Sequence, residues 1–148
     1  MGFTEAVRTV LTQKYATFSG RASRSEFWWF QLFYTLVLIA FLIVAALSGV
    51  FTNIENEPSS LLFIFGGIGG LFALAMFLPQ ISLQVRRFHD RNISAWWYLT
   101  LFLLNMIPAV GPIAGLAMLV ITILRGTEGP NKFGPDPLRP EARAEVFA

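Results

Sequence analysis

The distribution of charge along the chain constrains its fold more than any other feature. Three long stretches, residues 27–50, 61–85 and 93–124, contain no Asp, Glu, Lys or Arg. A helix needs about 20 predominantly apolar residues to cross a hydrocarbon layer about 30 Å thick. The three stretches therefore predict an all-α membrane protein embedded in a lipid bilayer.

The composition agrees with one membrane domain and excludes several kinds of site. Apolar residues make up 55% of the chain and charged residues 14%, against about 45–50% and about 25% in soluble domains. The chain has no Cys and one His, which excludes disulfides, thiolate nucleophiles and a His-rich metal site within one chain. The net charge of +2 is too small to indicate nucleic acid. We expect no cofactor and no nucleic-acid partner.

The first 22 residues are predicted to form an amphipathic helix and a linker. Apolar residues recur at helical spacing within residues 3–18, and most of the polar residues lie on the other side. Such a helix can lie in the headgroup plane with its apolar face down. It can equally pack on its own protein, and the sequence leaves both locations open.

Local signals predict where the first two membrane helices begin. Ser23 and Glu26 have capping-box spacing, in which each side chain bonds the backbone amide of the other, so the first helix is predicted over 23–50. The second apolar run predicts a helix over 61–85. Pro79 lies inside this helix and predicts a kink whose freed backbone groups find partners locally.

The third apolar run is too long to be one helix. Residues 94–124 as one helix would measure about 46 Å, which fits a 30 Å layer only at an unusually large tilt. Two prolines and a glycine within 107–112 break a helix. The run therefore predicts a hairpin of two short membrane-embedded segments, 94–107 and 112–125. Whether they cross the bilayer or re-enter it stays open.

The basic residues predict the topology. They flank the apolar runs before residue 27, between 86 and 91, and after residue 124, whereas the loop at 51–60 has none. Because basic residues near the ends of spans favour the cytoplasm, the four segments place both termini there. The membrane domain is predicted to cover 23–125, followed by a cytoplasmic Gly/Pro-rich tail at 126–148.

Three polar segments at the cytoplasmic side supply the candidate site. Arginine guanidinium groups bind phosphate through paired hydrogen bonds, so these segments predict a surface for an anion or a partner. The alternative interpretation assigns the same residues to topology signals, helix caps and turns. Catalysis would also need a nucleophile such as Ser23, Ser25 or Ser94, and no motif marks one. The candidate residues are Arg21, Arg24, Glu26, Arg86, Arg87, His89, Asp90, Asn131 and Asp136.

The same segments carry a family resemblance. GRASRSEFWWF at 20–30, RRFHDRNISAWWYL at 86–99 and GTEGPNKFGPDP at 126–137 resemble the signature segments of the bacterial membrane family called domain of unknown function 805. One departure is Asn92, in a stretch where a Gly is expected more often. The resemblance implies a multi-pass inner-membrane protein with no assigned activity, so it transfers no catalytic residue.

The functional expectation is a non-enzymatic component of the bacterial inner membrane. Its cytoplasmic Arg/His/Asp surface would bind anionic lipid headgroups or a membrane partner protein. One alternative is a small transporter or channel subunit, acting as a homo-oligomer, with a cavity lined by Gln80, Gln84 or Asn105. Another is a membrane enzyme that acts on lipid with His89 as general base.

Overall fold

The structure is an assembly of helices joined by short connections. The computed structural model describes residues 1–50 and 60–139, so all but the last residue of the predicted loop at 51–60 and the end of the tail at 140–148 lie outside the described residues. The described part contains no strand, only one isolated bridge between Asn131 and Gly134. The helices are α1 (Phe3–Arg8), the π-helix η1 (Thr9–Gln13), α2 (Arg24–Leu47), α3 (Ser60–Asp90), α4 (Ala95–Asn105) and α5 (Gly111–Ile123).

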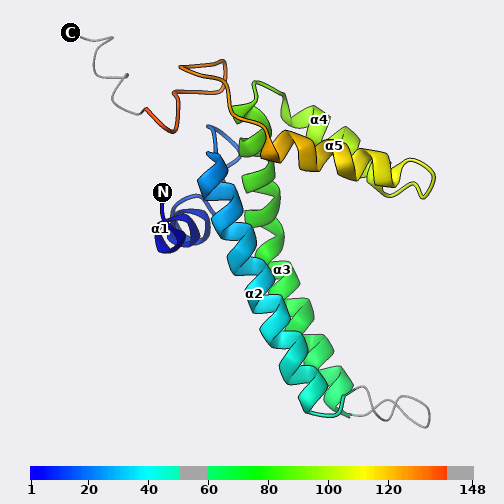
Figure 1. Cartoon of the computed structure of the whole chain (residues 1–148). Helices are drawn as coiled ribbons and strands as arrows, with labels where there is room; N and C mark the ends of the chain where they lie inside the picture. Colours follow the sequence, from blue (N-terminus) through cyan, green and yellow to red (C-terminus); the bar gives the residue numbers. More distant parts are fainter. Residues whose placement is uncertain (51–59, 140–148) are drawn as a thin grey trace.

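Helices α2 and α3 form a long antiparallel hairpin (Figure 1). By length and composition, both are able to cross a membrane. Helix α3 extends to Asp90, beyond the predicted end at Val85, because charge marks the edge of an apolar run without breaking a helix. The helix ends near Asn92, whose φ of 61° is the left-handed conformation that usually favours glycine. The departure from the family pattern is thus an asparagine, the other residue that tolerates this conformation.

The third apolar run is broken into α4 and α5, as predicted. The two helices form a shorter hairpin that leaves the end of α3 and diverges from the α2/α3 pair (Figure 1). Gly111 allows the turn, because a Cβ there would lie 2.6 Å from the carbonyl oxygen of Asn105. With 11 and 13 residues, α4 and α5 are shorter than a usual membrane span. Their location in the membrane, and hence the count of four embedded segments, stays a prediction.

The N-terminal helices pack against the protein. Ala6 and Val10 are fully buried, and the ring of Phe3 meets that of Trp29 on α2 edge-on, with their centroids 5.9 Å apart. The regular α-helix covers only Phe3–Arg8 before the π-helix begins, so it is shorter than the predicted range. Of the two locations left open by the sequence, packing on the protein is observed. Contact with lipid headgroups remains a prediction.

Pro79 shows how the N-terminal segment supports α3. A proline has no N–H, so the carbonyl of the residue four positions earlier, Ala75, loses its helical partner. The hydroxyl of Tyr15 donates a hydrogen bond to this carbonyl. The freed carbonyl therefore has a partner, but the prediction of a local partner is wrong, because the donor comes from a segment 60 residues away in the chain.

Candidate functional site

The three polar motifs meet where α2 begins and α3 ends. Ser23 caps α2 by accepting a hydrogen bond from the amide of Glu26 at 3.2 Å. The second half of the predicted capping box is wrong, because the Glu26 carboxylate instead pairs with Arg86 on α3. Both side chains of this pair are at most 3% exposed. Burying a charge costs a large free energy unless the charge is paired. The ion pair therefore holds the two long helices together at this end.

Asp90 connects a second set of buried charges. Its Oδ1 accepts a hydrogen bond from Nε of Arg21 at 2.9 Å, and its Oδ2 pairs with Arg87 one helical turn earlier. The three side chains are 0–5% exposed. We call Arg21, Glu26, Arg86, Arg87 and Asp90 the buried ionic cluster. A single carboxylate thus holds two guanidinium groups that would otherwise be buried without a counter-charge.

Arg87 also fixes the end of the second hairpin. Its Nε donates to the carbonyl of Thr122 at 3.1 Å, and its Nη2 donates to the carbonyl of Leu124. A third bond runs from Nη1 to the carbonyl of Ala22 at 3.3 Å. An arginine can do this because its five N–H donors point in different directions. One side chain therefore joins α3, the end of α5 and the segment before α2.

The C-terminal segment 126–139 folds over this cluster. The amide of Thr127 donates to the carbonyl of Asp90 at 2.8 Å, and Nη1 of Arg21 donates to the carbonyl of Gly129 at 2.6 Å. Gly126 passes so close to Asp90 that an added Cβ would overlap the carboxylate. The glycine is therefore required by close approach rather than by its backbone conformation.

His89 and Asn131 complete this contact. The imidazole of His89 stacks on the ring of Phe133 with 3.9 Å between centroids and 5° between planes. Its Nδ1 lies 3.2 Å from the carbonyl oxygen of Gly20, and its own carbonyl accepts a bond from Asn131 at 2.9 Å. Stacking and hydrogen bonding account for the His89 side chain, which is 8% exposed. We therefore assign His89 a packing role.

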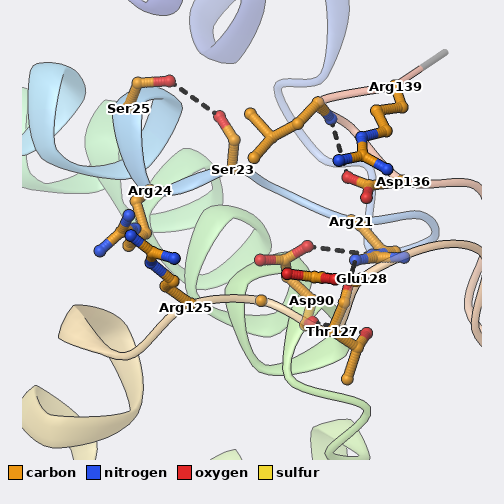
Figure 2. A pocket seen from close by; sticks show the side chains of 12 residues that line it. Arg21, Ser23, Arg24, Ser25, Asp90, Arg125, Thr127, Glu128, Asp136 and Arg139 are labelled. Atoms are coloured by element: carbon orange, nitrogen blue, oxygen red, sulfur yellow. Dashed lines mark hydrogen bonds and ion pairs between the residues drawn. The ribbon is translucent and has the colours of Figure 1, made fainter.

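A pocket of about 450 Å³ opens beside the cluster (Figure 2). We call it the arginine pocket. Arg24, Arg125 and Arg139 are exposed at its edge, and none of them forms an ion pair with another described residue. In Figure 2 the guanidinium groups of Arg24 and Arg125 point to the same region of the pocket. Its lining comprises Arg21, Ser23, Arg24, Ser25, Asp90, Arg125, Gly126, Thr127, Glu128, Asp136, Leu138 and Arg139.

The acidic groups of the pocket are mostly engaged elsewhere. Asp90 is shared by two arginines, as described above. Asp136 is 8% exposed and accepts hydrogen bonds from the amides of Gly129 at 3.1 Å and Leu138 at 2.9 Å. Only Glu128 is exposed and has no ion pair within the described residues. The open part of the pocket is therefore dominated by arginine.

The structure divides the nine candidate residues into two groups. Arg21, Arg24, Asp90 and Asp136 line the pocket. The other five hold the helices and the C-terminal segment together. The prediction that Arg86 and Arg87 belong to an exposed binding surface is wrong, because both are 0% exposed. Arg86 is paired with Glu26 of α2, and Arg87 with Asp90 of its own helix. The residues of this second group are Glu26, Arg86, Arg87, His89 and Asn131.

Sequence reasoning missed two arginines of the pocket. Arg125 and Arg139 were read only as basic residues that follow the last apolar run. Arg125 follows the last apolar run directly, as Arg24 closely precedes the first. This shared position could have indicated that the two side chains lie at the same end of the helices. The described residues contain no group of three or more His, Cys, Asp or Glu side chains placed to hold a metal ion.

Two long apolar helices, with a buried ionic cluster at one end, define a small helical transmembrane protein. The chain belongs to the family described as a protein of unknown function (DUF805), whose model matches residues 15–135. The inner membrane protein YhaH of Escherichia coli K12 is 37% identical over 125 residues, which cover 84% of this chain and 90% of that relative. The inner membrane protein YhaI of the same strain is 34% identical over 125 residues, with 84% and 89% covered. No solved structure matches the chain.

Proposed function

We propose that the protein is a non-enzymatic component of the bacterial inner membrane that binds a phosphate-bearing anion in the arginine pocket. The single observation that supports this best is the pair formed by Arg24 and Arg125. Two exposed guanidinium groups point to one region of a pocket and have no carboxylate partner among the described residues. Like charges repel when they are close together, so a bound anion would stabilise this arrangement.

The chemistry of the pocket favours phosphate. A guanidinium group donates two parallel hydrogen bonds to a phosphate, and such charge-assisted bonds are stronger than neutral ones. Ser25 lines the same pocket and can add a hydroxyl donor. We place this pocket at the cytoplasmic face with both termini, because the basic residues flank the apolar runs on that side. A reporter fused after Ala148 that is active only in the periplasm would contradict this orientation.

The binding test uses the purified full chain in a neutral detergent. We would titrate it with glycerol 3-phosphate and with short-chain phosphatidylglycerol, and follow Trp fluorescence or thermophoresis. Hydrogen bonds to charged groups contribute about 1.5–3 kcal/mol each. The double variant Arg24→Gln/Arg125→Gln should therefore raise Kd by at least about tenfold. Added salt should also weaken binding to the natural chain, because the exposed charges are screened.

The matched control is Lys132→Gln. Lys132 is an exposed basic residue of the same C-terminal segment, but it lies outside the pocket lining and faces the ring of Phe133. It should leave Kd unchanged. Equal affinity of the double variant and the natural chain would overturn the proposal, and saturable binding of an acidic peptide instead of phosphate would favour a partner protein as the ligand.

The transporter alternative has weaker support. A groove is lined by Gln84 and Asn105, as such a function would require, but Gln80 is not among its residues. On α2 the groove covers only 27–31, although this helix continues to Leu47. The groove is therefore confined to one end of the α2/α3 hairpin, and a path across the membrane would need further subunits.

A further inference from the structure

A second hollow lies next to the arginine pocket, between α2, the end of α3 and the α4/α5 hairpin. It has a volume of about 290 Å³, and three of its residues are amides. We call it the amide groove. Its lining comprises Phe27, Trp28, Gln31, Gln84, Asn105, Gly115, Met118, Leu119 and Thr122.

The pocket and the groove share one face of α2. On α2, Arg24 of the pocket is followed by Trp28 and Gln31 of the groove, at positions i, i+4 and i+7. Residues at these spacings lie on the same side of a helix. At the other wall, Thr122 of the groove lies in the last turn of α5, and Arg125 of the pocket follows it just beyond the extended C-cap Leu124. The two hollows are therefore neighbouring parts of one surface.

Chemical character changes in order along this surface. Along α2, the charged side chain of Arg24 is followed by the aromatic side chain of Trp28 and then by the amide of Gln31. We call these positions the charged, aromatic and amide levels. Gln31 lies seven residues, or about 10 Å, along the helix from Arg24. Tryptophan favours the boundary between headgroups and acyl chains. This order matches the cross-section of one bilayer leaflet, in which charged headgroups give way to uncharged polar links and then to hydrocarbon.

The amides have unused hydrogen-bonding capacity. The side-chain oxygens of Gln31 and Gln84 are both buried, and neither has a hydrogen-bond partner within the described residues. A buried polar atom without a partner costs about 1–3 kcal/mol, so a ligand that supplies a partner is favoured. Because a Gln side chain carries both an acceptor and two donors, rotation of the amide lets it bond either a hydroxyl or an ester carbonyl.

The groove also has apolar walls. Met118 and Leu119 of α5 line the groove opposite α2, and the α2/α3 and α4/α5 hairpins diverge from this region (Figure 1). A free phosphate or a soluble metabolite would leave these apolar walls uncovered. An amphiphile with a charged end, an uncharged polar middle and hydrocarbon chains complements the charged level, the amide level and the apolar walls.

We infer that a single two-chain glycerophospholipid occupies both hollows. Its phosphate binds Arg24 and Arg125, its ester carbonyls bond the amides of Gln31 and Gln84, and its chains leave between the two hairpins. This inference rests on the proposed anion binding and names the source of the anion. The ligand is a membrane lipid bound at a specific place, rather than a soluble phosphate compound.

The experiment separates the two hollows by variant and by probe. The probes are glycerol 3-phosphate, which has no esters or chains, and short-chain phosphatidylglycerol. The variant Gln31→Leu/Gln84→Leu should bind phosphatidylglycerol about tenfold more weakly and bind glycerol 3-phosphate unchanged, because only ester contacts are lost. The variant Arg24→Gln/Arg125→Gln should lose both probes. The control Gln80→Leu changes a half-buried amide on α3 outside the groove and should alter neither.

A second measurement needs no variant of the protein. The natural chain should bind diester phosphatidylglycerol several-fold more tightly than the diether analogue, which lacks the carbonyl oxygens. Equal affinity for the two lipids, or full lipid binding by the Gln variant, would overturn the lipid assignment while leaving the anion site intact. Unchanged binding by the Arg variant would overturn the anion site itself.

Discussion

Asp90 is predicted to stabilise the protein more than any other acidic residue of the pocket. It lies between Arg21 and Arg87, and the three side chains are at most 5% exposed. The substitution Asp90→Asn keeps the size of the side chain and one acceptor, but it leaves two buried guanidinium groups without a counter-charge. Removing one partner of a buried ion pair costs about 3–5 kcal/mol. Because asparagine keeps an acceptor, we expect a loss near the lower end, about 3 kcal/mol, or roughly a hundredfold in the unfolding equilibrium.

The loss can be measured by titrating the detergent-solubilised protein with SDS and following Trp fluorescence. Glu128→Gln is the matched control, because Glu128 is an exposed acidic residue of the same pocket with no ion pair in the described structure. Its substitution should change stability by less than about 0.5 kcal/mol. If Asp90→Asn and Glu128→Gln had equally small effects, the assignment of Asp90 as the shared counter-charge would be refuted.

Two further predictions concern contacts between distant segments. Gly126→Ala should destabilise the protein by about 1–3 kcal/mol, because the new Cβ overlaps the carboxylate of Asp90 and must displace it. The SDS titration measures this loss. A neutral effect would show that the C-terminal segment does not approach Asp90 so closely. Tyr15→Phe should cost about 1 kcal/mol, because the carbonyl of Ala75 loses its donor. In a Pro79→Ala background, which restores the helical N–H, the cost of Tyr15→Phe should largely vanish; an unchanged cost in this double-mutant cycle would argue against the contact.

The sequence alone determined the class of the protein and several local features. The charge-free runs at 27–50 and 61–85 predict two long apolar helices, and the proline–glycine cluster at 107–112 predicts the break between α4 and α5. These features depend on the chemistry of consecutive residues, so they can be read without knowing what packs against them. The meeting of the three polar motifs was also predicted, because the basic residues that flank the apolar runs assign all three motifs to one side of the membrane.

Only the tertiary structure decided which charged residues are scaffold and which are open. Arg24 and Arg86 both flank an apolar run, yet Arg24 is exposed at the pocket and Arg86 is fully buried against Glu26. The Glu26 side chain pairs with Arg86 instead of bonding the amide of Ser23 as predicted. A hydrogen bond between two charged groups is stronger than one between a carboxylate and a neutral backbone amide. Burial depends on which distant side chain lies opposite, and the position of a residue in the sequence does not contain that information.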